Sequence, residues 1–168
     1  MYDDLINKHK NFGILIDSNI LLTWIIGIID VRYIQKFKRT REYTEIDFNI
    51  IDKLLNYFSI WYTIPNIITE INNLANSLDK ERKKKFYDVY TKLIFNVFEH
   101  HIPSQEAIKK YPVEFIKFGI TDCIIYNLCK RNILILTADF PIAQYLEKQN
   151  LDVINYNHIR GEQYLKFD

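Results

Sequence analysis

The chain has 168 residues, 48% of them hydrophobic, and its 22 basic and 21 acidic residues give a formal net charge of +1. This length and apolar content suffice for one hydrophobic core, so we expect a single domain over residues 1–168. A net charge so close to zero neither requires nor excludes nucleic acid as a partner.

Two features indicate a cytoplasmic protein without a membrane partner. Cys123 and Cys129 lie six residues apart on one expected helix and so point to different faces, which argues against a local disulfide or a shared metal and fits a reducing compartment. The apolar run at 20–29 has half the length of a membrane span.

Short apolar segments typical of buried strands alternate along the chain with segments of helical periodicity. We expect strands at 13–16, 61–64, 98–102, 133–136 and 151–154. We expect helices at 18–29, 45–58, 66–78, 81–97, 105–110, 122–130 and 142–149. This alternation predicts an α/β fold with a mostly parallel central sheet of about four to five strands, flanked by helices on both faces.

Four acidic residues are predicted to lie near one edge of this sheet. Asp17 and Asp139 each follow a strand segment, and the carboxyl ends of parallel strands share one edge. Glu70 and Asp122 lie on the flanks of the apolar faces of their expected helices. Three of the four also have a structural explanation, because Asp17 and Asp139 can cap helices and Asp122 can interact with a helix dipole.

The four carboxylates together favour a metal site. Their mutual repulsion would raise their pKa values and cost stability unless a cation were bound. Mg²⁺ and Mn²⁺ prefer oxygen ligands of this kind, so either ion is the expected cofactor.

Three segments, "LIDSNILL", "IPNIITEI" and "GITDCIIYNLCKRNILILTADFPIAQYLEKQNLDVINY", occur in this order between Gly13 and Tyr156. In this order they resemble the PIN domain family of metal-dependent ribonucleases, many of which are toxins of bacterial toxin–antitoxin pairs. The resemblance implies a PIN-like α/β sandwich that hydrolyses RNA with Mg²⁺ or Mn²⁺, and it makes an antitoxin protein a possible partner. The residues that fall on the acidic positions of the family, and so would hold metal and catalyse hydrolysis, are Asp17, Glu70, Asp122 and Asp139. Asn19 and Thr137 fall on supporting positions.

The chain also departs from the family pattern. The segment 30–58 is expected to be a helical insertion. It contains the basic residues Arg39 and Arg41, which either contact the phosphates of the substrate or belong to a solvated loop. Phe140 follows Asp139 where many family members have a further acid, so the number of metal ions stays open.

Three other segments have mainly structural interpretations. The basic run at 80–85 is expected to be a solvated helix face, and His100 and His101 are expected at a strand end. The apolar helix at 20–26 has more hydrophobic residues than one stripe needs, so we expect a second copy or an antitoxin-like protein to cover part of it, with burial inside the monomer as the alternative.

Two other function classes compete with the nuclease. A haloacid-dehalogenase-like phosphatase also places an aspartate after its first strand, but it requires a second aspartate at position 19, which is Asn. A PIN-like binding or scaffolding module without catalysis is the other alternative, and four unused carboxylates would cost such a module stability.

Overall fold

The computed structural model describes residues 2–164 and has a five-stranded parallel sheet at its centre. The strands are β1 (Ile14–Ile16), β2 (Trp61–Thr63), β3 (Phe98–Glu99), β4 (Leu134–Thr137) and β5 (Val153–Asn155). They are arranged in the order β3-β2-β1-β4-β5, and each pair of neighbours is parallel. The predicted α/β class and the parallel sheet are therefore confirmed, and the sheet is parallel throughout.

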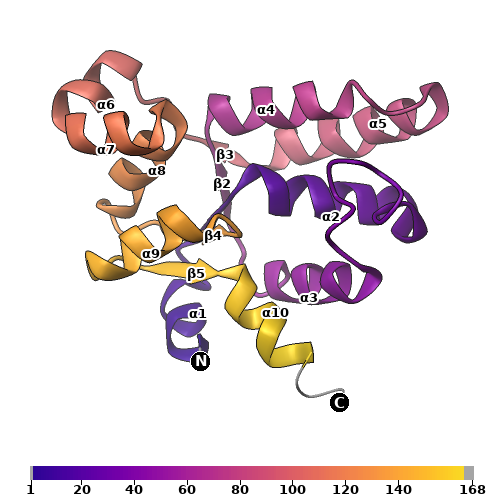
Figure 1. Ribbon diagram of the computed structural model, residues 1–168, viewed down its shortest axis with the longest axis horizontal. Coiled ribbons are helices and arrows are strands. Elements are labelled where there is room, and N and C mark those ends of the chain that lie inside the picture. Colours follow the sequence, from indigo (N-terminus) through magenta and orange to yellow (C-terminus); the bar gives the residue numbers. More distant parts are fainter. Residues whose placement is uncertain (1, 165–168) are drawn as a thin grey trace.

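Ten α-helices and one 3-10 helix surround the sheet within residues 2–164. They are α1 (Asp3–His9), α2 (Ser18–Asp30), η1 (Val31–Tyr33), α3 (Glu45–Leu55), α4 (Pro65–Ala75), α5 (Lys80–Asn96), α6 (Ser104–Lys110), α7 (Pro112–Phe118), α8 (Ile120–Cys129), α9 (Phe140–Lys148) and α10 (Tyr156–Tyr164). Figure 1 shows α2, α4 and α5 on one side of the sheet and α6, α7 and α8 on the other, so helices cover both faces.

The sequence did not predict three of these helices. α1 and α7 have only seven residues each, too few to establish a helical period, and two apolar side chains of α7, Val113 and Ile116, are exposed. α10 begins directly after β5 without a turn signal between them. In each case tertiary packing, and not a local pattern, decides the helix.

The centre of the sheet is dry and apolar. Ile14, Leu15 and Ile16 of β1 are at most 1% exposed, and β1 has a hydrogen-bonded neighbour on each side. Helices cover the sheet on both faces, so β1, β4 and β5 are buried along their whole length, whereas β2 is partly exposed and the edge strand β3 is exposed. In the three buried strands, polar side chains begin only at the carboxyl end.

Helix α2 is buried by its own chain. Ile20, Leu22 and Ile25 are fully buried, and α2 packs against α3, α4 and α5. At Gly27 a Cβ atom would lie only 2.1 Å from a ring carbon of Phe48, so a glycine is needed for the close approach of α2 and α3. The monomer therefore buries most of the apolar surface at 20–26, as the alternative interpretation expected. Trp24 is partly exposed and Ile28 is exposed, and a partner that covers this side of α2 stays a prediction.

The segment 30–58 is only partly helical. Turns connect η1 to α3, and a reciprocal capping box between Thr44 and Asp47 begins α3. Asp47 is completely buried, lies 2.9 Å from Nε of Arg160, and accepts a hydrogen bond of 2.8 Å from the hydroxyl of Tyr156. This network ties the segment 30–58 to the C-terminal helix α10.

Among the described residues, no helix combines the length and the apolar character needed to cross a membrane. Cys123 and Cys129 are both buried and free.

Candidate active site

The carboxyl ends of β1 and β4 bring Asp17 and Thr137 side by side. Ile16 pairs with Leu136, so one residue further along the two strands Asp17 lies next to Thr137. The Thr137 hydroxyl donates a hydrogen bond of 2.7 Å to Oδ2 of Asp17, and the backbone N–H of Ser18 donates one of 2.7 Å to Oδ1. These two bonds determine the orientation of the Asp17 carboxylate.

The charges of all four predicted acids reach one another. Burial raises the pKa of Asp17 above its usual range, and the carboxylates of Glu70 and Asp139 raise it further against the hydrogen bonds from Thr137 and Ser18. Burial, followed by the charges of Asp17, Asp139 and Glu70, raises the pKa of Asp122 to about 7. The sheet edge and helices α4 and α8 therefore gather the four acids into one electrostatic cluster, which we call the acidic cluster.

Two members of the acidic cluster also cap helices. Asp17 is the N-cap of α2, and Asp139 is the N-cap of α9, where its Oδ1 accepts a hydrogen bond of 3.3 Å from the N–H of Ile142. The Thr137 hydroxyl also accepts a hydrogen bond of 3.0 Å from the N–H of Asp139. The capping interpretation from the sequence therefore holds for both residues, and capping leaves further lone pairs on each carboxylate for other partners.

The chemistry of the acidic cluster fits a hard divalent cation, but its side chains do not form a ready coordination shell. The donors are carboxylate oxygens, the type that Mg²⁺ and Mn²⁺ prefer, and their mutual repulsion would be relieved by positive charge. Within residues 2–164, however, no three His, Cys, Asp or Glu side chains are placed so that they could hold one metal ion together. Glu70 and Asp139 are exposed and so have room to change rotamer.

The sequence analysis missed Asn155, which the structure places in the same row as Asp17 and Thr137. Thr137 pairs with Asn155 at the end of β5, so the three side chains share one face of the sheet at its carboxyl edge. Asn155 is fully buried, and its Nδ2 has no hydrogen-bond partner among the described residues. The sequence did contain a signal for this position, because Asn155 is a polar residue at the end of the last apolar strand.

The other predicted residues lie outside this row. The side chain of Asn19 is exposed and makes no hydrogen bond to the acids in the described part of the chain, so it does not support them as expected. Arg39 and Arg41 are exposed. They lie in the same turn region as Tyr43, a buried residue close enough for the charge of Asp17 to raise its pKa, after burial and Glu42.

Two segments with an expected structural role are tied to neighbours of their own chain. In the basic run of α5, Arg82 pairs with Asp79 at 2.7 Å and Lys85 with Glu81 at 2.8 Å. The ring of His100 packs against Tyr62 with centroids 5.0 Å apart.

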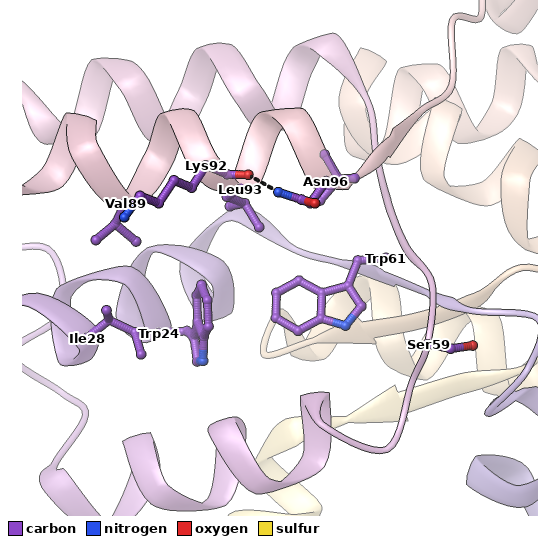
Figure 2. A pocket seen from close by; sticks show the side chains of 9 residues that line it. Trp24, Ile28, Ser59, Trp61, Val89, Lys92, Leu93 and Asn96 are labelled. Atoms are coloured by element: carbon purple, nitrogen blue, oxygen red, sulfur yellow. Dashed lines mark hydrogen bonds between the residues drawn. The ribbon is translucent and has the colours of Figure 1, made fainter.

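An apolar pocket of about 460 Å³ lies away from the acidic cluster (Figure 2). Its walls come from α2, α5 and the start of β2, and include the indoles of Trp24 and Trp61, whose N–H groups bond to Asp52 and to the carbonyl of Leu55. Among the described residues, the lining of this pocket contains no acid, so it has none of the carboxylates that form the acidic cluster.

Comparison with known proteins gives no match for this chain, neither to a family model, nor to a curated protein, nor to a solved structure.

Proposed function

We propose that the chain is a Mg²⁺- or Mn²⁺-dependent endoribonuclease. The observation that carries this proposal is the acidic cluster itself, in which burial and the charges of Asp17, Asp139 and Glu70 together raise the pKa of Asp122 to about 7. Such repulsion costs stability in a metal-free protein, and strongly shifted pKa values are concentrated at functional sites. The sequence resemblance to PIN domains points to the same four residues.

The location of the cluster supports an active site. In open parallel α/β sheets, ligands bind beyond the carboxyl ends of the strands, which is where Asp17 and Asp139 lie. Bound Mg²⁺ or Mn²⁺, held by Asp17, Glu70, Asp122 and Asp139, would supply Lewis-acid polarisation of a phosphodiester and activation of water.

The chain's own residues position this chemistry. Thr137 and the N–H of Ser18 hold the carboxylate of Asp17 in place, and the N–H of Ile142 bonds to the exposed carboxylate of Asp139, which can still change rotamer to reach a cation. Without a cation, the carboxyl group of Asp122 keeps its proton up to about pH 7. Cation binding favours the ionised form and releases that proton.

The direct test is cleavage of an end-labelled single-stranded RNA. We expect cleavage with Mg²⁺ or Mn²⁺, none in EDTA, and none by Asp17→Asn or Asp122→Asn. Asp152→Asn is the matched control, because Asp152 pairs with Lys8 and His9 and does not belong to the acidic cluster. Cleavage that survives EDTA, or survives both cluster substitutions, would overturn the proposal.

A second candidate is a metal-free binding module of the same fold, and the capping roles of Asp17 and Asp139 favour it, together with the lack of a ready ligand set. Thermal melts of the wild type and Asp139→Asn, each in EDTA and in Mn²⁺, separate the two. Asn also caps well, so a pure capping role predicts almost no change. A metal site predicts that Mn²⁺ stabilises the wild type and that Asp139→Asn reduces this gain. A wild-type melting temperature indifferent to millimolar Mn²⁺ would favour the module.

The resemblance also makes the chain a candidate toxin with an antitoxin partner, or a homodimer. Induced expression should then arrest growth, and Asp17→Asn should abolish the arrest. Equal growth of cells that express either protein would count against a toxin.

A further inference from the structure

A groove of about 550 Å³ runs between α4 and the start of α8, and it opens beside the acidic cluster. It is lined by Pro65, Asn66, Thr69, Glu70, Asn73, Leu74 and Thr121, and we call it the amide groove. Glu70 is itself a member of the acidic cluster, and Thr121 directly precedes Asp122. Whatever occupies the groove therefore lies next to the proposed site of hydrolysis.

One face of α4 provides most of the polar lining. Asn66, Thr69, Glu70 and Asn73 are spaced three or four residues apart, which places them on one side of the helix. The opposite side, with Ile67, Ile71 and Ala75, is fully buried in the core. The core thus fixes the rotation of α4 and turns its amide face toward the groove.

Most polar side chains of this face have no hydrogen-bond partner within residues 2–164. Those of Asn66, Thr69 and Asn73 make no hydrogen bond with any described residue. Their neighbours outside the groove do have partners, since Asn72 accepts a hydrogen bond of 2.8 Å from Tyr87 and Asn76 one of 2.9 Å from Lys83. The amides of Asn66 and Asn73 are therefore available for a ligand.

The charge of the groove excludes phosphate as its main occupant. Of the described residues that line the groove, Glu70 alone is ionisable, and none is a lysine, arginine or histidine. A phosphate in the groove would meet a carboxylate without compensation, whereas an uncharged group with donors and acceptors would meet two amides and two hydroxyls. Nucleobases have this chemistry, and in single-stranded RNA their edges are free to form hydrogen bonds.

We infer, on the basis of the proposed nuclease function, that the amide groove binds the bases of a single-stranded RNA segment adjacent to the cleaved phosphate. Asn66 and Asn73 donate to and accept from base edges, and the phosphates of the bound nucleotides lie outside the groove. Unpaired RNA fits this arrangement better than base-paired RNA, whose Watson–Crick edges are occupied.

The test measures binding by fluorescence anisotropy with labelled RNA octamers, once in EDTA and once in Ca²⁺, at low salt. The double variant Asn66→Ala/Asn73→Ala should bind about tenfold more weakly than the wild type, the effect of about two lost hydrogen bonds. Asn76→Ala removes an exposed asparagine just beyond α4 and outside the groove, so it should bind like the wild type. The same octamer annealed to its complement should bind at least about tenfold more weakly than the single strand.

Each outcome decides the inference independently of catalysis. Unchanged affinity in the double variant, equal affinity for the duplex, or no binding in either buffer would overturn it. If the double variant alone loses affinity, the groove assignment stands even when Mn²⁺ gives no cleavage, and only the proposed activity then fails. Cleavage by the wild type combined with unchanged affinity in the double variant would leave the nuclease and remove the base-binding groove.

Discussion

Replacing Asp122 by asparagine should stabilise the metal-free protein at pH 8 and should stabilise it less than half as much at pH 5. The pKa of Asp122 is raised from 3.8 to about 7 by burial and by the charges of Asp17, Asp139 and Glu70. Between about pH 4 and pH 7 the native state keeps a proton that the unfolded chain has released. The free energy of unfolding of the wild type therefore falls as the pH rises through this window.

The size of the effect follows from the shift. A rise of about three pKa units corresponds to about 4 kcal/mol, because one unit is worth about 1.4 kcal/mol. Asp122 is partly exposed, and solvent screening reduces this to about 2 kcal/mol. Asn has nearly the shape of a protonated Asp, so the variant should gain about 2 kcal/mol over the wild type at pH 8 and only about 0.8 kcal/mol at pH 5, where about 1.2 of the roughly 3.2 pH units of the window have been passed.

The assay is urea denaturation in metal-free buffer at both pH values, followed by the fluorescence of Trp24 and Trp61. Asp152→Asn is the control, and its effect on the free energy of unfolding should have the opposite sign. Burial raises the pKa of Asp152, but hydrogen bonds from Lys8 and His9 outweigh it and lower the pKa, so its loss should destabilise the protein to a similar extent at both pH values. If Asp122→Asn behaves like this control, the four carboxylates do not repel one another and the acidic cluster is a set of independent structural residues.

Two further experiments probe the packing and the basic loop. Gly27→Ala would press a Cβ atom against the ring of Phe48, so we expect it to lower the free energy of unfolding by about 1–3 kcal/mol. The control Gly161→Ala lies in α10 with open space around it and should raise the free energy of unfolding by about 0.5–1 kcal/mol. Equal effects of the two variants in urea denaturation would contradict the close approach of α2 and α3. If Arg39 and Arg41 contact phosphates, the variant Arg39→Ala/Arg41→Ala should make the slope of log K for RNA against log salt less negative by about 1.4, and an unchanged slope would assign them to a solvated loop.

The sequence by itself determined the strands and the positions of the acids. Apolar runs such as 14–16 and 134–136 can be stable only inside a sheet covered on both faces, so the α/β class and the parallel arrangement could be predicted. The same pattern ends abruptly at Asp17 and Thr137, which places polar residues at the strand ends without knowledge of the strand order. The acids are therefore local features of the chain.

Tertiary structure decided what these residues contact. Only the register of β1, β4 and β5 places Asn155 in the row of Asp17 and Thr137, because 120 and 138 residues separate Asp17 from the other two. The rotation of α4 likewise separates the free amide of Asn73 from the bonded one of Asn72, although the two are adjacent in the sequence. Packing of α2 against three helices of its own chain buries most of the apolar surface that the sequence left open to a partner. Local sequence specifies the chemical groups that are available, whereas packing and register, which depend on distant residues, decide which of them meet.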